Sequence, residues 1–258
     1  MTSGNDESFY VGYQPTPPGL RRWLLRVVAI TLIGCCALIA VLAAGQRDPG
    51  RGVWQIDDVQ TFTGMLRSSP YLTLVEDSGR ALLLTGPTKQ SADDWAHGLI
   101  GKRVVVRGHA VTRGDLRLVS MAEEETPIVA ADAASRPVGE LLPATSAIVA
   151  DVSTPVRLAG EIIDPKCYAG AMKPGDGKAH KACATLCIRG GIPPVLVTHT
   201  PDRTPAFLVL TDRDGQRLAG DRLSSILHLV AEPVIVTGRQ FSRDGLVFIR
   251  VDEVERNP

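Results

Sequence analysis

The sequence predicts a mainly β protein in which an N-terminal transmembrane helix is followed by two OB-like small barrels. The helix is predicted by an uncharged apolar run at 27–45. The barrels are predicted by short, alternating apolar runs that turn residues separate, and by the same order of runs and glycines occurring twice. The second occurrence also holds a segment rich in cysteine, so we expect the second barrel to carry a Cys/His helical insertion at 164–194.

The run Val27–Gly45 contains no charged residue, and a bilayer core requires about 20 apolar residues. Apolar residues continue on the near side of Arg26, so we expect a cytoplasmic arm over 1–22 and a transmembrane helix over 23–45. Three arginines precede the run and two follow it. This bias favours a single-pass protein of the inner membrane, with its N-terminus in the cytoplasm and its C-terminal domains in the periplasm.

Two other interpretations of the apolar run remain open. It could belong to a cleaved signal peptide, because residues 40–45 are rich in alanine. It could also belong to a lipoprotein, because Leu32–Cys35 resembles a lipidation motif. The 22 residues before the run are long for a signal peptide, and the chain stays apolar after Cys35. Both features favour an uncleaved anchor whose partner is the lipid bilayer.

The charge of the chain argues against one class of partner, and its motifs argue against common enzyme classes. Lysine and arginine together number 28, as do aspartate and glutamate, so the formal charge is zero. Nucleic-acid-binding proteins carry a basic surface, and we therefore expect no nucleic acid partner. The chain contains no G-x-S-x-G, H-E-x-x-H, P-loop or G-x-G-x-x-G sequence, which favours a binding or structural role over an enzyme.

The internal repeat is anchored by two pairs of glycines. Gly64 in TFTG corresponds to Gly160 in RLAG, and Gly108 in VVVRGH corresponds to Gly238 in VIVTGR. After the second glycine of each copy, a turn sequence precedes another alternating run, and this pattern is typical of a β-hairpin. We infer that one β-scaffold is used twice.

The order of elements in each copy favours a five-stranded OB-like barrel, with helical stretches expected near 91–100 and 221–229. We place the first barrel at 52–125 and the second at 156–256. The Ala-, Pro- and Ser-rich residues 126–155 between them are expected to be a linker or a covering segment. A β-sandwich formed from both halves is the structural alternative.

The segment at 164–194 holds nearly all of the functional signal. Asp176 is a favourable N-cap and a Gly-Gly pair a favourable C-cap, so we expect a helix over 178–189. On this helix His180, Cys183 and Cys187 stand at positions i, i+3 and i+7, which share one face. An imidazole and two thiols are therefore expected to project together.

A third thiol, Cys167, is expected to end the preceding strand and to meet this face. Three cysteines and one histidine form a tetrahedral ligand set that suits zinc, while soft thiolates, with Met172 nearby, also suit copper. Asp164 is a weaker candidate as an orienting carboxylate or a turn residue, and His199 is a weaker candidate just past the segment. The expected metal ligands are Cys167, His180, Cys183 and Cys187.

Two alternatives to a metal site stay open. An exported compartment is oxidising, so Cys167 could pair with Cys183 or Cys187 in a stabilising disulfide of a purely structural subunit. Two of the thiols could instead cycle in a thiol–disulfide oxidoreductase.

The segment resembles one found in a group of exported bacterial OB-like proteins of unassigned function. Their motif runs D-x-x-C-[YF], a Gly-rich loop, H-x-x-C-A-x-x-C, then G-[IK]-P. The resemblance covers roughly 150–258 and implies export and an OB-like fold, but no activity. The matching residues are Asp164, Cys167, Tyr168, His180, Cys183, Ala184, Cys187, Gly191 and Pro193.

These observations together predict a membrane-anchored periplasmic metal-binding or thiol-redox protein. A single helix preceded by an arm with three aromatic residues is what a docked subunit would have. We therefore expect the partner to be a larger membrane complex, in which the protein would be an accessory subunit of a respiratory or electron-transfer assembly.

Overall fold

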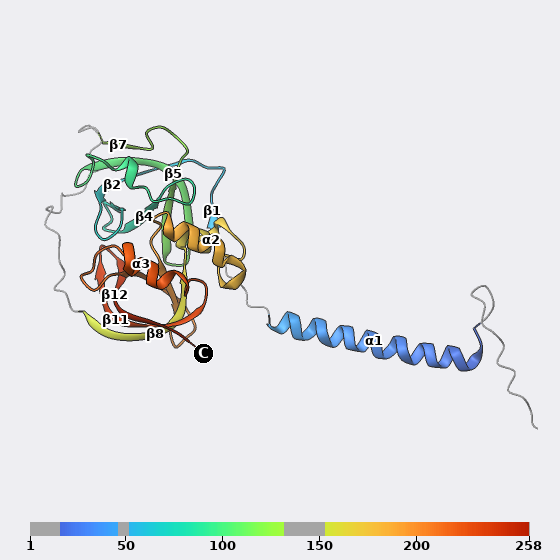
Figure 1. Cartoon of the computed structure of the whole chain (residues 1–258). Coiled ribbons are helices and arrows are strands. Elements are labelled where there is room, and N and C mark those ends of the chain that lie inside the picture. Colours follow the sequence, from blue (N-terminus) through green and yellow to red (C-terminus); the bar gives the residue numbers. More distant parts are fainter. Residues whose placement is uncertain (1–15, 46–51, 132–152, 258) are drawn as a thin grey trace, which may run out of the picture. The chain divides into compact units, whose positions relative to one another are not determined.

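The computed structural model describes residues 16–45, 52–131 and 153–257. The described chain forms a long N-terminal helix and, as a separate unit, two groups of strands (Figure 1). The helices are α1 (Pro18–Gly45), α2 (Gly177–Arg189) and α3 (Gly220–Leu227), with a short 3₁₀ helix η1 (Asp93–Trp95) and a π-helical turn η2 (Cys167–Ala171). The strands are β1 (Val53–Trp54), β2 (Gln60–Arg67), β3 (Thr73–Glu76), β4 (Ala81–Thr85), β5 (Arg103–Arg113), β6 (Leu116–Met121), β7 (Ile128–Ala130), β8 (Thr154–Ile163), β9 (Val195–His199), β10 (Pro205–Thr211), β11 (Pro233–Arg243) and β12 (Leu246–Arg256).

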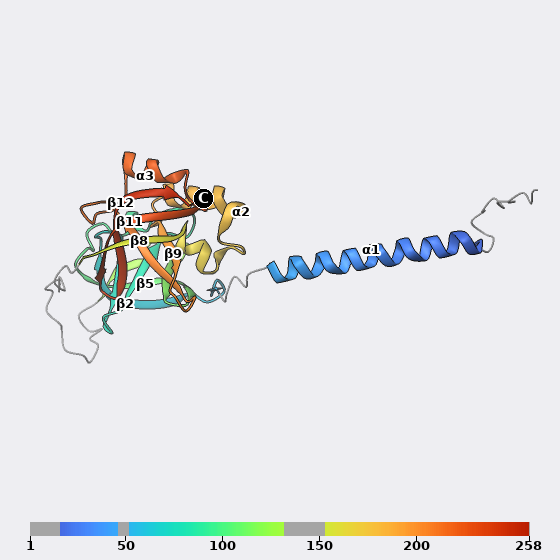
Figure 2. The same cartoon turned by 90° about the horizontal axis from the view of Figure 1, so that it is seen from below.

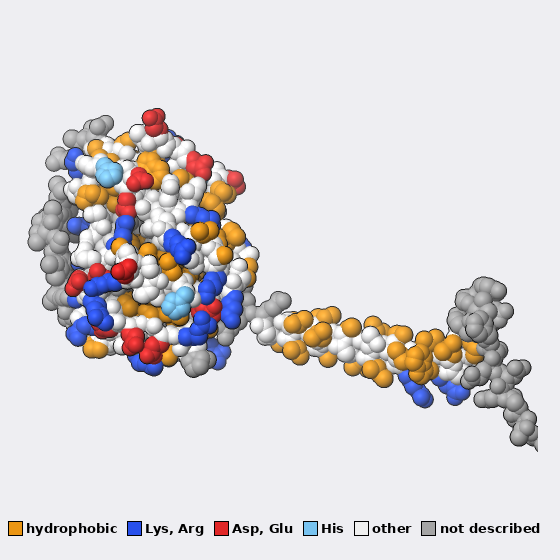
Figure 3. Space-filling view, viewed as in Figure 1, with side chains coloured by type: hydrophobic (Ala, Val, Ile, Leu, Met, Phe, Trp, Pro, Cys, Tyr) orange, Lys and Arg blue, Asp and Glu red, His pale blue; other side chains and the backbone are white. Residues whose placement is uncertain are grey.

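Helix α1 is long and apolar enough to span a membrane. It has 28 residues, and its most apolar window has a mean hydropathy of 2.8. Figure 3 shows apolar side chains over its surface and basic ones gathered towards one end. The helix begins at Pro18 rather than at residue 23, because proline is tolerated in a first helical turn, where its missing N–H is not needed. Residues 1–15 of the expected arm lie outside the described residues.

The first group of strands forms a closed barrel in the order β2-β3-β4-β6-β5, with β5 returning to β2. All of its pairings are antiparallel except β4 with β6. Two short strands, β1 and β7, add to β5 outside this circuit. Strand β5 is long enough, at 11 residues, to pair with β1, β2, β6 and β7.

The second group closes in the corresponding order, β8-β9-β10-β12-β11, and β10 with β12 is again the parallel pair. Figure 2 shows these strands from another side, with α2 beside them. The prediction of a mainly β protein with two small barrels is confirmed. The strands do not form the alternative β-sandwich, because each half closes on itself through its own parallel pair.

The repeated glycines have a steric explanation. A Cβ atom on Gly64 would lie 2.3 Å from the carbonyl oxygen of Val75, and one on Gly160 would lie 2.2 Å from that of Val197. Each glycine therefore lets the first strand of its barrel approach the second strand closely. The two positions are equivalent in the fold, because each sits opposite the start of the fourth strand of its own barrel.

The hairpin predicted at the end of the second copy is confirmed. Asp244 and Gly245 join β11 to β12 with φ angles of 50° and 78°. Two positive φ values in a two-residue turn match the right-handed twist of the flanking strands, and Asp-Gly is favoured there because both residues tolerate that conformation.

The expected helical stretches differ in outcome. Near 91–100 the chain forms only the one-turn η1, whereas 221–229 is close to α3. Within the expected linker 126–155, Ile128–Ala130 is a strand of the first barrel's sheet and Thr154 already begins β8. Residues 132–152 lie outside the described residues.

The two barrels share a hydrophobic cluster in addition to their separate cores. The hydroxyl of Tyr71 in the first barrel donates to the carbonyl oxygen of Leu210 (2.8 Å) and accepts from the amide of Leu218 (3.2 Å) in the second. Asp93 and Arg217 form an ion pair between the barrels. The buried residues of the shared cluster are Tyr71, Leu83, Val111, Leu116, Leu118, Ile163, Tyr168, Ala169, Val195, Val197, Val209, Phe241 and Phe248.

Candidate metal centre

The cysteine-rich segment connects the first two strands of the second barrel. It occupies residues 164–194, whereas the same connection in the first barrel needs only 68–72. Helix α2 lies within it and packs Ala184 and Ile188 into the core of the second barrel. The barrel core therefore fixes which face of α2 points inward.

The N-terminus of α2 is capped from another element. Asp176 occupies the N-cap position, as predicted, but its side chain makes no capping hydrogen bond. The carboxylate of Glu161 on β8 instead accepts from the amide of Gly177 at 2.6 Å. Burial raises the pKa of Glu161 despite this hydrogen bond. The amide of Gly177 at the start of the helix is therefore satisfied by the distant Glu161, and not by the neighbouring Asp176 that the sequence predicted as the cap.

Cys167 does not end the preceding strand, so that expectation is wrong. Strand β8 ends at Ile163, and Asp164 then forms a tight turn in which its Oδ1 accepts from the amide of Lys166 at 2.9 Å. An aspartate that binds the amide two residues on is a typical turn former. The turn leads directly into η2, whose first residue is the buried Cys167.

The structure brings the predicted ligands together in two overlapping groups that share Cys167. One ligand atom from each of Cys167, His180 and Cys183 lies within 4.8 Å of the others, and the same holds for Asp164, Cys167 and Cys187. In a tetrahedral zinc site with sulfur ligands, donor atoms lie about 3.8 Å apart. Small side-chain movements therefore suffice for this cluster to hold a metal ion.

Two buried polar atoms in the cluster have no hydrogen-bond partner. They are Nε2 of His180, whose residue is 3% exposed, and Oδ2 of Asp164, whose residue is fully buried. Leaving such an atom unpaired costs about 1–3 kcal/mol, so native proteins rarely do it. A metal ligand is one role that explains an unpaired ring nitrogen beside thiols. Burial also lowers the pKa of His180, which favours the neutral ring that binds metals.

The sulfur atoms are in close contact with one another. The pKa of Cys167 is raised by its contact with Cys187, by burial and by the carboxylate of Asp164. This thiol therefore keeps its proton until a cation takes its place. All five cysteines of the chain are free, so the structure gives no support to a stabilising disulfide.

Two lysines that the sequence analysis did not single out lie at the cluster. The ammonium of Lys89, from the first barrel, is 2.6 Å from Sγ of Cys183 and 3.9 Å from Sγ of Cys187. The contact with Cys183 raises the pKa of Lys89. No local signal identifies this residue, because it precedes Cys183 by 94 positions.

Lys166 joins the cluster to the same part of the first barrel. Its buried ammonium donates to the carbonyl oxygens of Gly86 (2.8 Å), Pro87 (2.7 Å) and Thr88 (3.0 Å). Burial lowers the pKa of Lys166 to about 8. Its position directly before Cys167 was the only sequence signal that pointed to it.

The weaker candidates separate into two groups. Asp164 forms the predicted turn and also places its carboxylate within 4.8 Å of the sulfurs of Cys167 and Cys187. Met172 is 47% exposed, and His199 ends β9 as an exposed residue. Neither is positioned with the buried cluster.

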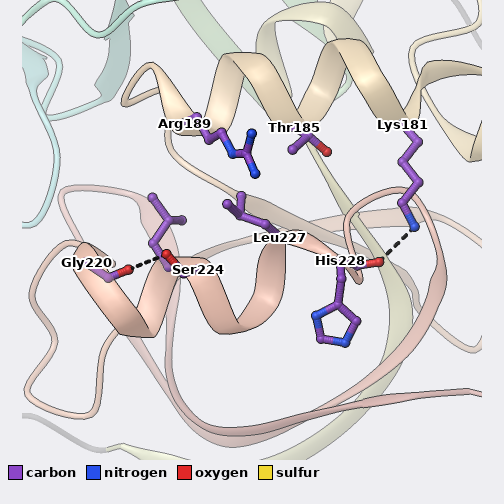
Figure 4. Close-up of a pocket in the computed structure, with 8 residues that line it drawn as sticks. Lys181, Thr185, Arg189, Gly220, Ser224, Leu227 and His228 are labelled. Carbon is purple, nitrogen blue, oxygen red and sulfur yellow. Dashed lines mark hydrogen bonds between the residues drawn. The ribbon is translucent and has the colours of Figure 1, made fainter.

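The opposite face of α2 lines a shallow pocket with α3 (Figure 4). Lys181, Thr185 and Arg189 point from α2 towards α3, and Lys181 donates to the carbonyl oxygen of His228 at 2.8 Å. None of the cysteines lines this pocket. The chemistry of the segment therefore lies on the inner face of α2.

Comparison of the chain with protein-family models, with curated proteins and with solved structures finds no match. The function is therefore argued from the chemistry of the cluster.

Proposed function

We propose that this chain is a membrane-anchored metal-binding protein. Cys167, His180, Cys183 and Cys187 hold one metal ion, zinc or copper, at the inner face of α2. The observation that carries the proposal is the buried ring of His180, which has a nitrogen within 4.8 Å of the free thiols of Cys167 and Cys183 and whose Nε2 has no hydrogen-bond partner. Three thiolates and one imidazole are a ligand set that suits zinc, and soft sulfur ligands also suit copper.

Asp164 is the fifth donor of the cluster in this proposal. One oxygen of its carboxylate lies within 4.8 Å of the sulfur atoms of Cys167 and Cys187, and its Oδ2 has no hydrogen-bond partner. The carboxylate either replaces one sulfur ligand or holds a neighbouring ligand in orientation. Its full burial is explained in both cases, because an adjacent metal ion offsets the cost of burying a negative charge.

We also propose that both barrels are OB-like and that 164–194 is an insertion into the second. The shared strand order with one parallel pair supports the first statement. The difference in length between 164–194 and the equivalent 68–72 supports the second. The exported OB-like proteins with the D-x-x-C-[YF] motif are the proposed relatives.

Helix α1 is the proposed anchor, with the N-terminus in the cytoplasm and the barrels in the periplasm. The length and apolar surface of α1 support a single span, and the arginines on its N-terminal side support the orientation. Protease added to intact spheroplasts is expected to digest the barrels. Digestion only in inverted vesicles would contradict this orientation.

The metal proposal is tested on the full chain purified in mild detergent. Metal content is measured by elemental mass spectrometry, and thiols are counted after unfolding in the same sample. About one metal ion per chain and five free thiols support the proposal. No metal and three thiols would show a disulfide and overturn it.

Variants assign the site in the same measurement. His180→Ala is expected to lower the bound metal well below one per chain, because it removes a ligand. His228→Ala is the matched control, since His228 is an exposed histidine on the opposite side of α2. Equal loss in both variants would mean that the metal is held elsewhere.

A thiol–disulfide oxidoreductase is the second candidate, and the contact between Lys89 and Cys183 favours it. Reactive cysteines lie in electropositive, partly exposed surroundings, and Cys183 is a partly exposed thiol beside the ammonium of Lys89. In this reaction two thiols of the cluster lose two electrons and two protons to form a disulfide, while a partner disulfide is reduced to two thiols. Equilibration with glutathione buffers and thiol trapping would show a reversible two-electron step, which a metal site alone does not predict.

A role as an accessory subunit of a larger membrane respiratory complex extends the proposal to partners. The single helix α1 with exposed apolar side chains supports docking within the bilayer. Crosslinking in membranes followed by purification is expected to recover the chain with other membrane proteins. A lone monomer after the same treatment would count against this role.

A further inference from the structure

We propose that Lys89 of the first barrel is a positioning residue of the metal centre and that both barrels therefore build this site. Lys89 holds the sulfurs of Cys183 and Cys187 as ligands for a divalent cation. This inference rests on the proposed metal function and goes beyond it, because it assigns a role to the first barrel and a charge class to the metal.

The contact itself is specific. The Nζ atom of Lys89 lies 2.6 Å from Sγ of Cys183 and 3.9 Å from Sγ of Cys187. The ammonium therefore lies at the mouth of the cluster, beside the two sulfurs that α2 supplies. The lysine ammonium is a compact charge with three N–H donors. It can therefore donate a hydrogen bond to sulfur without the fixed planar geometry that the guanidinium of arginine requires.

The loop that carries Lys89 is held rigidly. The amide of Gly86 donates to the carbonyl oxygen of Gln90 at 2.9 Å, which closes the loop after β4. The amide of Ser91 donates to the carbonyl oxygen of Gly190 at 2.8 Å, which fixes the loop to the end of α2. Lys166 binds the three carbonyls before Lys89. The backbone that carries Lys89 is therefore held in place by hydrogen bonds to the second barrel.

Gly190 permits this approach. A Cβ atom at Gly190 would lie 1.8 Å from the carbonyl oxygen of Lys89, so no larger residue fits while the loop is in place. The φ angle of Gly190 is −73°, so its backbone conformation alone does not require glycine. The close contact with the Lys89 loop is what requires it.

The second barrel has the same loop without the lysine. The amide of Asp212 donates to the carbonyl oxygen of Gln216 at 2.8 Å, and Thr211 bridges to Arg217 as Thr85 bridges to Ser91. The scaffold thus supplies a tight loop after the third strand of each barrel. Only in the first barrel does this loop carry a lysine to the cysteines.

The charges explain why a cation belongs there. When one divalent ion replaces three thiol protons, the ligand set becomes one unit more negative. A buried uncompensated charge is costly, and the ammonium of Lys89 offsets it. A divalent ion held by three thiolates and neutral His180 carries a net charge of −1, and the ammonium of Lys89 balances that charge.

The test measures zinc affinity of the detergent-solubilised full chain at pH 7 by competition with a chromophoric chelator. Lys89→Met is expected to weaken zinc binding by about tenfold, which is the low end for residues that act through a ligand, because Lys89 is exposed. Lys89→Arg, which keeps the charge, is expected to recover part of the loss. Lys102→Met, at an exposed lysine of the same barrel, is the matched control and should bind as the parent chain does.

Cobalt supplies a second readout that a merely structural role would not change. Its thiolate charge-transfer absorption is expected in the parent chain and is expected to shift in Lys89→Met, because the hydrogen bond to Cys183 is lost. Gly190→Ala is expected to reproduce both effects by displacing the loop.

The outcomes separate the two proposals. If the parent chain binds neither zinc nor copper, the metal function itself fails. If the parent chain binds zinc and Lys89→Met binds it equally tightly with an unchanged cobalt spectrum, the metal function stands and the role of Lys89 is overturned.

Discussion

At the scale of single residues, burial decides what a side chain in this protein can do. Asp164 and His180 are common surface residues, yet here each has a buried polar atom without a hydrogen-bond partner. Met172 and His199, which the sequence made similar candidates, are exposed and lie apart from the cluster. The same chemical type therefore carries a different role according to the neighbours that the fold places around it.

Tyr71 shows the same dependence at the boundary between the barrels. Its hydroxyl satisfies the carbonyl oxygen of Leu210 and the amide of Leu218, and burial strongly raises its pKa. We expect Tyr71→Phe to lower the free energy of unfolding by about 1–3 kcal/mol, because it leaves two buried backbone groups unpaired. Urea unfolding followed by tryptophan fluorescence measures this change. An unchanged midpoint with the same slope would contradict it.

At the scale of elements, helix α2 both packs against the barrel core and carries three of the candidate ligands. Ala184 and Ile188 pack it into the barrel core, and this fixes the direction of the neighbouring His180, Cys183 and Cys187. The helix spacing alone predicted that these three side chains share a face. Which way the face points follows from the hydrophobic anchor.

The cap from Glu161 gives a prediction for this helix. Glu161→Ala removes the acceptor of the Gly177 amide, so we expect a loss of about 1 kcal/mol in unfolding free energy. We also expect faster hydrogen–deuterium exchange in the first turn of α2, which contains His180. Glu161→Gln keeps an acceptor and is the matched control. Equal exchange in both variants would show that this carboxylate does not cap the helix.

At the scale of the whole molecule, the two barrels form one folded unit, and the apolar helix α1 belongs to another. They share a hydrophobic cluster, and the Lys89 loop of one barrel contacts the end of α2 in the other. In the proposed metal centre both barrels therefore take part, although every predicted ligand belongs to the second.

The ion pair between Asp93 and Arg217 gives the barrel interface a pH dependence. Burial alone would raise the pKa of Asp93, but its hydrogen bonds and charge interaction with Arg217 outweigh burial and hold the pKa below its ordinary value. A lowered folded-state pKa adds stability that is present above the unfolded pKa of about 4 and is lost as the pH falls through the lower folded value.

We therefore expect Asp93→Asn to cost up to about 1 kcal/mol at pH 7, a small value because the pair is one-third exposed. Between about pH 5 and pH 3 the variant should lose less stability than the parent chain. Urea unfolding across this range measures both effects. Asp57→Asn, at an exposed carboxylate, is the control, and identical pH profiles for the parent chain and Asp93→Asn would refute the prediction.

Local features of the sequence predicted what depends on neighbouring residues. The apolar run predicted α1, the turn residues predicted the hairpin at Asp244 and Gly245, and the paired glycines predicted two copies of one strand pattern. Helical spacing placed His180, Cys183 and Cys187 on one face. Each of these features depends on chain geometry over a few residues or on the transfer of apolar side chains from water. Both can be read from the order of residues along the sequence.

Only the tertiary structure decided how distant segments meet. The position of Cys167 in η2, the inclusion of Asp164, the cap from Glu161 and the approach of Lys89 all depend on packing between elements that are far apart in the chain. Such contacts arise because both barrels bury a common cluster, and burial acts on the whole surface without regard to sequence separation. The sequence therefore determined which donors the candidate site contains. The packing of the two barrels determined which of these donors converge, and it placed the ammonium of Lys89 beside them.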